Sequence, residues 1–296
     1  MEYSRKKQVN IFLCITGILF FLTSIFIISG QAYAYSQNQY FNLLQNRLIQ
    51  DGFNPAKIKK LYKSPGVTFD TKGVSLYFVH KESKLNYDQF LEKDQIQKAK
   101  NYIAANQKAF ISTEKAYGVE RYVITAIILV ETRLGTYVGK RSILNTLSTM
   151  AALADANNRK ILWKKIAGST RLSKTEFKAK AQRKSSWAYQ ELKAFLKHCI
   201  KENINPLTIN GSYAGAMGIC QFMPTNILTL ARDGNGDGRI DLFNNADAIR
   251  SIASYLNNSG WYSGISTQKA FNVIYTYNHS KYYVRTVLKI AQLLRG

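Results

Sequence analysis

Acidic residues are scarce in this sequence, as are the histidines and cysteines on which many metal and nucleophilic sites depend. The chain has 18 Asp and Glu against 41 Lys and Arg. Its three histidines, His80, His198 and His279, are far apart, and no HExxH, CxxC, Walker or GxSxG motif occurs. These absences argue against zinc-dependent hydrolysis and against a serine-triad enzyme.

The excess of basic residues gives a formal net charge of +23 over 296 residues. Such a balance favours a polyanionic partner: nucleic acid, an anionic membrane or an acidic cell wall. The sequence is 46% hydrophobic and 20% charged, which is typical of a globular protein. Its length allows one large core or two small ones.

The first 34 residues narrow the choice of partner. Basic residues at 5–7 precede an apolar run over 9–28, and an A-x-A cleavage pattern ends at Ala34. This order predicts a secretory signal peptide over 1–34. The apolar run is also long enough to remain as a membrane anchor. Export disfavours nucleic acid as a partner, so we expect a protein of the periplasm or cell envelope.

The cysteines allow two interpretations. Cys14 belongs to the N-terminal segment, which leaves Cys199 and Cys220 in an exported chain. An oxidising compartment would let this pair form a disulfide. Two buried free thiols explain the pair equally well, and the sequence leaves both interpretations open.

Helical periodicity dominates the rest of the chain. Apolar residues follow helical patterns over 36–50, 87–117, 186–201, 245–258 and 282–294. Residues 66–80 instead alternate and are rich in β-branched and aromatic side chains, which predicts two short strands. The predicted fold is therefore mainly α, with a small α/β extension near the N-terminus. We expect an N-terminal region over 35–110 and a core over 111–296.

Residues 159–184 form a basic insertion in this core. The stretch contains ten Lys or Arg, one Glu and few large apolar residues. A solvated helical excursion is the simplest interpretation, and a surface that binds the cell wall or an anionic membrane is the alternative.

Glu131 follows a run over 123–130 that is apolar except for Thr125. A helix that is apolar on all sides is buried, and Gly135 is a suitable residue to follow its end. Burial and the negative end of the helix dipole both disfavour the anion, so we expect a raised pKa at Glu131. Such a carboxyl suits general acid catalysis. The alternative is a buried structural glutamate that is paired with Arg133, Arg141 or a backbone amide.

A glycine-rich stretch, GSYAGAMGICQFMP, covers 211–224. Its glycines allow tight turns and the close approach of a ligand, while Ser212 and Gln221 supply polar groups. Pro224 is well suited to begin a helix. Considered alone, such a loop is most often a device for close packing.

Three separated motifs together carry a family resemblance. VETRLG around Glu131, GSYAGAMGICQFMP, and TYNHSKYY over 276–283 resemble the membrane-bound lytic murein transglycosylase B family. The resemblance covers about 85–156 and 186–296, with the motifs in the family's order. It implies a lysozyme-like helical core around a saccharide groove.

The resemblance also implies a reaction. One glutamate, here Glu131, would cleave the β-1,4 bond between N-acetylmuramic acid and N-acetylglucosamine in peptidoglycan. It would act first as acid and then as base, giving a 1,6-anhydromuramyl product without consuming water. A hydrolytic muramidase and a catalytically silent peptidoglycan-binding module are the competing interpretations. We expect a monomer that binds glycan strands and no nucleic acid.

Further groove residues follow from the same resemblance. They are Ser212, Gln221, Tyr255, Tyr277, Asn278 and Tyr283. Tyrosine rings pack on the apolar faces of sugars while their hydroxyls form hydrogen bonds. For Tyr255 and Tyr283, packing in the core is nearly as good an interpretation. The chain departs from the family at Cys220, where glycine is expected, and a bond to Cys199 would brace the loop.

An aspartate-rich segment resembles an EF-hand loop. DGNGDGRID begins at Asp233, with Gly238 at the sixth position and Asp241 at the ninth. The twelfth position is Asn244, and the resemblance implies that Asp247 closes a longer loop. The predicted ligands of a structural Ca²⁺, with Na⁺ as a substitute, are Asp233, Asn235, Asp237, Arg239 through its carbonyl, Asp241 and Asp247. A metal-free turn is the alternative.

Overall fold

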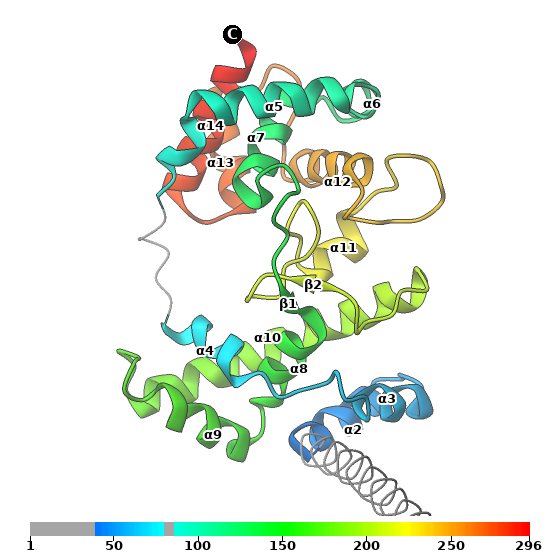
Figure 1. The fold of residues 1–296 in the computed structure, drawn as a ribbon, viewed down its shortest axis with the longest axis vertical. Coiled ribbons are helices and arrows are strands. Elements are labelled where there is room, and N and C mark those ends of the chain that lie inside the picture. Colours follow the sequence, from blue (N-terminus) through cyan, green and yellow to red (C-terminus); the bar gives the residue numbers. More distant parts are fainter. Residues whose placement is uncertain (1–38, 80–85) are drawn as a thin grey trace, which may run out of the picture. The chain divides into compact units, whose positions relative to one another are not determined.

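The computed structural model describes residues 39–79 and 86–296, which form two compact units that divide after Phe69 (Figure 1). The predicted signal peptide over 1–34 lies outside the described residues. The domain boundary that we placed at residue 110 falls inside a helix of the second unit.

The first unit is a small helical pair. A 3₁₀ turn, η1 (Gln39–Phe41), leads into α2 (Asn42–Gln50), and α3 (Pro55–Tyr62) follows. Asn54 caps α3, because its side-chain oxygen accepts a hydrogen bond from the Lys57 amide at 3.0 Å. The rings of Phe41 and Tyr62 are buried, with centroids 5.2 Å apart, and they tie α2 to α3.

The second unit is also helical. Its elements are α4 (Thr71–Val79), η3 (Asp88–Leu91), α5 (Lys93–Ala105), α6 (Gln107–Tyr117), α7 (Arg121–Thr132), β1 (Arg141–Ser142), α8 (Ile143–Ala152), α9 (Ala156–Ile166), α10 (Lys174–Lys201), β2 (Asn210–Gly211), α11 (Pro224–Leu230), α12 (Asn245–Asn258), α13 (Thr267–Tyr277) and α14 (Lys281–Arg295). Among the described residues, none of these helices has the length and apolarity needed to cross a membrane.

Helix α7 forms the centre of this unit, as its apolar sequence predicts. Residues 123–129 are buried all round the helix, and α7 contacts α5, α12 and α14. A second group of helices packs around α10, which contacts α8, α9 and α11 (Figure 1). The strands β1 and β2 form a short antiparallel pair in which Arg141 lies opposite Gly211.

The two strands predicted over 66–80 are wrong, because α4 occupies most of this segment. The Asp70 side chain accepts a hydrogen bond from the Gly73 amide at 2.7 Å, which caps the start of the helix. Val74 and Phe78, four residues apart, are both buried. Capping and helical spacing therefore prevail over β-propensity, and the N-terminal extension is helical.

Two predicted helices have different limits in the structure. The segment 87–117 is divided into η3, α5 and α6, with Asn106 ending α5 and preceding α6. The basic insertion is helical, as expected, but its second part is continuous with the helix that we began at residue 186. Ser173 and Glu176 form a capping box that starts α10 at Lys174 instead.

Candidate active site

Glu131 lies in the last turn of α7, and a tight left-handed turn follows it. Arg133, Leu134 and Gly135 have φ values of 50°, 60° and 83°. The helix therefore ends before the expected glycine, with Arg133 as its C-cap. Glu131 is half-buried, because its carboxylate lies at a cavity and is not enclosed in the core.

A hydrogen bond links Glu131 to the last helix of the chain. The Tyr283 hydroxyl donates to Oε1 of Glu131 at 2.8 Å. Burial, and then the charge of Glu131, raise the pKa of Tyr283 well above its ordinary value, so the phenol remains a donor at neutral pH. A donated hydrogen bond stabilises the carboxylate form of Glu131, which opposes the effect of burial.

The cavity beside Glu131 has a volume of about 300 Å³. Its walls come from the segment 86–90, the end of α7 with the turn that follows, and residues around the start of α14. The polar or aromatic side chains that line it with Glu131 include Tyr87, Gln89, Tyr137, Asn278 and Tyr283. Among the described lining residues, Glu131 is the single carboxylate.

Two contacts hold the segment 86–90 against this site. The Tyr87 ring meets the Tyr283 ring edge to face, with centroids 6.5 Å apart. The Arg133 guanidinium donates to the side-chain oxygen of Gln89 at 2.8 Å. This wall was not predicted from the sequence, because the segment lies far along the chain from Glu131 and was predicted to belong to a long helix over 87–117.

Thr132 joins the end of α7 to the glycine-rich stretch. Its hydroxyl donates to the Ile219 carbonyl at 2.9 Å and accepts a hydrogen bond from the Gly135 amide at 3.1 Å. The side chain is buried. Apart from its position directly after Glu131, nothing in the sequence indicated that Thr132 links α7 to the glycine-rich stretch.

Ser212 and Gln221 shape the glycine-rich loop from within. The Ser212 hydroxyl oxygen accepts hydrogen bonds from the amides of Ala214 and Ala216 at 3.3 and 3.0 Å. Gln221 has a φ of 50°, and its side-chain amide donates to the carbonyls of Val138 and Gly218. These side chains stabilise the turn and do not line the Glu131 cavity.

Tyr255 and Tyr277 pack together beside this loop. Their ring centroids are 4.8 Å apart, and both rings contact Phe222. The Tyr277 hydroxyl donates to the Cys220 carbonyl at 2.5 Å, and the Tyr255 hydroxyl donates to the Thr276 carbonyl at 2.7 Å. Of the predicted groove residues, only Asn278 and Tyr283 line the cavity with Glu131.

The disulfide that we considered between Cys199 and Cys220 is not formed. Both cysteines are free and buried. Burial raises the pKa of Cys199 to about 12, and it also raises the pKa of Cys220. These thiols therefore remain protonated at neutral pH and act as small apolar groups in the core.

Glu191 supports the far end of the glycine-rich loop. Its buried carboxylate accepts hydrogen bonds from the amide and the hydroxyl of Thr225, both at 2.9 Å. Burial raises its pKa, although the two bonds from Thr225 act in the opposite direction. Glu191 thus fixes the first turn of α11 on α10.

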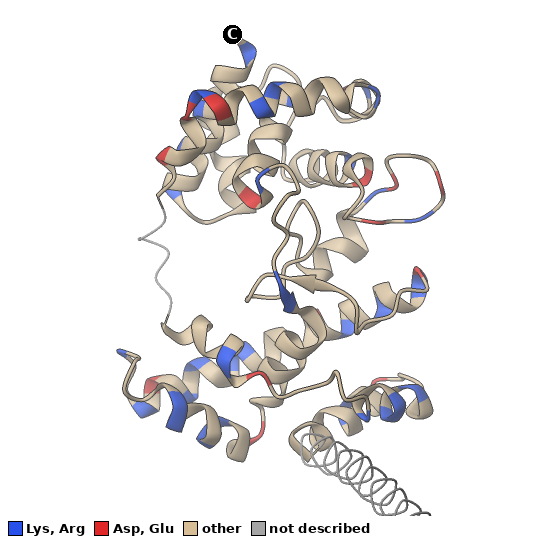
Figure 2. Ribbon diagram, viewed as in Figure 1, with Lys and Arg blue, Asp and Glu red and all other residues tan. Residues whose placement is uncertain are grey.

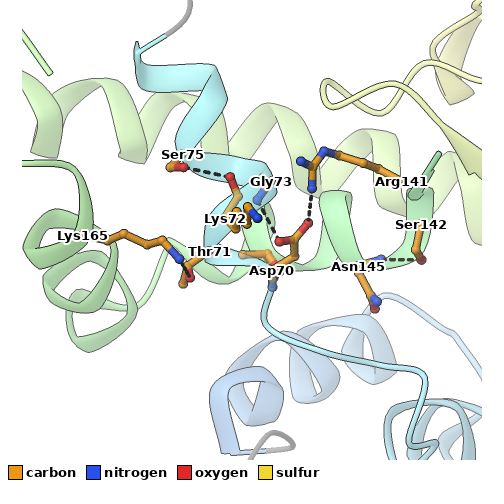
Figure 3. Close-up of polar contacts among 10 residues, drawn as sticks. Asp70, Thr71, Lys72, Gly73, Ser75, Arg141, Ser142, Asn145 and Lys165 are labelled. Carbon is orange, nitrogen blue, oxygen red and sulfur yellow. Dashed lines mark hydrogen bonds and ion pairs between the residues drawn. The ribbon is translucent and has the colours of Figure 1, made fainter. Parts of the chain in front are cut away.

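Arg141 connects the β1–β2 pair to the start of α4 (Figure 3). Its guanidinium lies 3.2 Å from Oδ2 of Asp70, whose other carboxylate oxygen caps α4. The Asp70 amide donates to the Thr149 hydroxyl at 2.9 Å. Arg141, one of the partners considered for Glu131 from sequence, therefore forms an ion pair with Asp70.

The aspartate-rich loop has the donor chemistry of a calcium site. Gly236 and Gly238 both have φ values of 81°, and the Asp233 carboxylate accepts hydrogen bonds from their amides. The buried Asp247 carboxylate accepts from the amides of Gly234 and Asp241, both at 2.8 Å. Within the described residues, no three Asp, Glu, His or Cys side chains converge closely enough to hold a metal ion.

The fold resembles those of solved lytic transglycosylases. The Escherichia coli lytic transglycosylase SLT35, solved in complex with calcium, has a TM-score of 0.71 at 22% identity, covering 86% of this chain and 92% of that one. The soluble lytic transglycosylase SltB1 from Pseudomonas aeruginosa has a TM-score of 0.70 at 22% identity, covering 86% and 98%. These likenesses concern the fold, and they confirm the expected lysozyme-like class.

The family model described as the transglycosylase SLT domain matches residues 36–269, so the chain belongs to that family. A curated relative is the membrane-bound lytic murein transglycosylase B of Escherichia coli (strain K12), which is 32% identical over 175 residues. The match covers 59% of this chain and 41% of the relative, and therefore less than half of the relative's length.

Proposed function

We propose that this chain is an exported lytic transglycosylase of the cell envelope, which acts as a monomer on the glycan strands of peptidoglycan. Family membership and the activity named for the Escherichia coli relative support the reaction class. The observation that carries the proposal is Glu131, the single carboxylate among the described residues that line its cavity, which accepts a hydrogen bond from the Tyr283 hydroxyl.

The proposed reaction uses Glu131 twice. Protonated Glu131 gives its proton to the glycosidic oxygen as the bond to C1 of N-acetylmuramic acid breaks. The resulting carboxylate then takes the proton from the C6 hydroxyl of the same sugar, whose oxygen attacks C1. The product is a 1,6-anhydromuramyl end, and no water enters. Glycosidases that use two carboxyls need a second one within about 5–10 Å, which the described cavity lining does not supply.

Tyr283 would assist the second half of this cycle. Its hydroxyl stabilises the Glu131 carboxylate after the first proton transfer and keeps it oriented. Tyr283→Phe removes this donor and retains the buried ring. We expect turnover to fall about 10-fold or more with little change in stability, since a hydrogen bond to a charged carboxylate is worth roughly 1.5 kcal/mol or more.

The matched control for this variant is Tyr282→Phe, because the Tyr282 side chain next to it is 70% exposed. Turbidity of a peptidoglycan suspension measures both rates. Equal rates for the two variants would mean that the bond to Glu131 has no part in catalysis. If the wild-type protein bound peptidoglycan without clearing it, the chain would be a binding module.

We also infer that the loop 233–247 binds a structural Ca²⁺, with Na⁺ as a weaker substitute. The oxygen donors are Asp233, Asn235, Asp237, the Arg239 carbonyl, Asp241 and Asp247, and hard oxygen ligands suit calcium. Support comes from the two glycine turns and from the calcium complex of the SLT35 relative. The ion would offset repulsion among carboxylates and stabilise the start of α12.

Calcium at a hundredfold excess over its Kd should stabilise the protein by about 2.7 kcal/mol and raise the melting midpoint by about 5–10 °C. The double variant Asp237→Asn/Asp241→Asn keeps side chains that can accept the loop's hydrogen bonds but removes two charges. It should lose the calcium shift. Melting curves with calcium and with chelator test this, and an unchanged wild-type midpoint would identify the loop as a metal-free turn.

A further inference from the structure

A second cavity lies between α9 and the first turns of α10. Its volume is about 560 Å³, and it shares no lining residue with the Glu131 cavity. We call it the α9–α10 groove. The residues that define its character are Arg159, Lys160, Trp163, Lys164, Lys174 and Lys178.

The five cations of this groove form no ion pair with a carboxylate within the described part of the chain. Arg159 donates to the carbonyls of Leu153 and Ala154 at 2.6 and 2.7 Å, which anchors it to the end of α8. The four lysines are exposed. Figure 2 shows the basic residues gathered on α9 and the first half of α10, with few acidic residues among them.

The wall between these cations is mainly apolar. Trp163 is half-buried, and its ring lies 5.3 Å from the ring of buried Phe177. Ile161, on the same helix, is 37% exposed. Tryptophan side chains favour the boundary between hydrocarbon and water, where one part of the ring is apolar and the indole N–H is hydrated.

The groove has lysines around its edge and an apolar wall at Trp163. It is therefore complementary to a ligand in which an anionic group is attached to an apolar part. A soluble polyanion would satisfy the lysines and leave the wall around Trp163 in water. An anionic phospholipid supplies both parts, because its phosphate lies next to the glycerol and acyl chains. Near such a membrane surface each lysine contributes roughly 1 kcal/mol of attraction.

We propose that the α9–α10 groove docks the protein on anionic phospholipid bilayers. The lipid phosphate lies among Lys160, Lys164, Lys174 and Lys178, and the glycerol and upper acyl region lie against Trp163. This surface is separate from the proposed saccharide site, and it would hold the enzyme at the membrane while the Glu131 cavity remains available to peptidoglycan.

The test uses the full chain with vesicles of phosphatidylcholine and about 30% phosphatidylglycerol, the latter brominated on its acyl chains. Bromine quenches tryptophan only at close range, so the emission of Trp163 reports contact at the groove itself. Trp163→Phe isolates that signal from the other tryptophans. All variants share the same N-terminus, so any contribution of the segment 1–34 to binding is the same in each of them.

We expect brominated phosphatidylglycerol to quench the tryptophan emission of the wild-type protein but to quench that of Trp163→Phe much less. Added salt should weaken the quenching of the wild-type protein. The variant Lys160→Gln/Lys164→Gln/Lys174→Gln/Lys178→Gln should lose most of this quenching. The matched control replaces four exposed lysines of the first unit, Lys57, Lys59, Lys60 and Lys63, with Gln, and should retain it.

Several results would overturn the proposal. Equal quenching of the wild-type protein and Trp163→Phe would mean that the groove does not touch lipid. If vesicles of brominated phosphatidylcholine alone quenched the emission as strongly as those with brominated phosphatidylglycerol, the groove would not require an anionic lipid. Binding of inorganic polyphosphate through the same four lysines, with Trp163 left unquenched, would assign the groove to a soluble polyanion.

Discussion

Glu131→Gln is expected to fold like the wild-type protein and to cleave peptidoglycan about 10²- to 10⁴-fold more slowly, the usual loss when a general acid–base group is removed. Glutamine keeps the shape of the side chain and an oxygen that can accept the Tyr283 hydroxyl, so the cavity should be preserved. It cannot donate a proton of suitable acidity or accept one. The loss should therefore fall on turnover, with binding of glycan strands retained.

The matched control is Glu92→Gln, because Glu92 is exposed and lies two residues after the segment 86–90 that lines the cavity. It makes the same replacement of a carboxyl by an amide outside the cavity and should leave turnover unchanged. Circular dichroism and melting of both variants check folding. Turnover of Glu131→Gln close to that of the wild-type protein would make Glu131 a structural carboxylate.

Gly139→Ala is expected to destabilise the protein by more than about 3 kcal/mol, which lowers the melting midpoint by roughly 10 °C. Gly139 has a φ of 94°, which an alanine adopts only under strain. Its added Cβ would lie 2.1 Å from the Gly211 carbonyl oxygen and 2.8 Å from the Ser212 amide. Both neighbours are backbone atoms of the glycine-rich loop. In the variant, the added Cβ would therefore push the turn after α7 away from this loop.

Gly168→Ala provides the control for the glycine substitution. Gly168 lies between α9 and α10, and an added Cβ would meet nothing within 4 Å. Its backbone also lies outside the left-handed region. Its melting midpoint should stay within a few degrees of the wild type. If Gly139→Ala and Gly168→Ala had the same melting midpoint, the close packing of the turn after α7 on the glycine-rich loop would be contradicted.

The regular helices could be predicted because their signals are local. The apolar run before Glu131 specified a buried helix, and α12 and α14 match their expected limits closely. The helix α4 was mistaken for strands because its apolar residues alternate, while the one local helix signal, an Asp at the N-cap position, is short and common. The break between α5 and α6 at Asn106 could not be predicted either, because no glycine or proline marks it in the sequence.

The site shows the limit of local reasoning more clearly. Glu131 and Tyr283 are 152 residues apart, so only the family resemblance connected them. For Tyr283 the two interpretations, core packing and saccharide groove, turn out to be compatible, since the ring is buried and its hydroxyl meets the carboxylate. The wall formed by Tyr87 and Gln89 depends on contacts between distant segments, for which one sequence carries no signal.

The most direct test of the central claim is the identity of the product. Purified peptidoglycan is digested in water enriched in heavy oxygen, and the muropeptides are analysed by mass spectrometry. We predict 1,6-anhydromuramyl ends that contain no oxygen from the solvent, because the C6 hydroxyl of the same sugar closes the ring. Reducing muramic acid ends labelled with solvent oxygen, as the sole product, would contradict the account and identify the protein as a hydrolase.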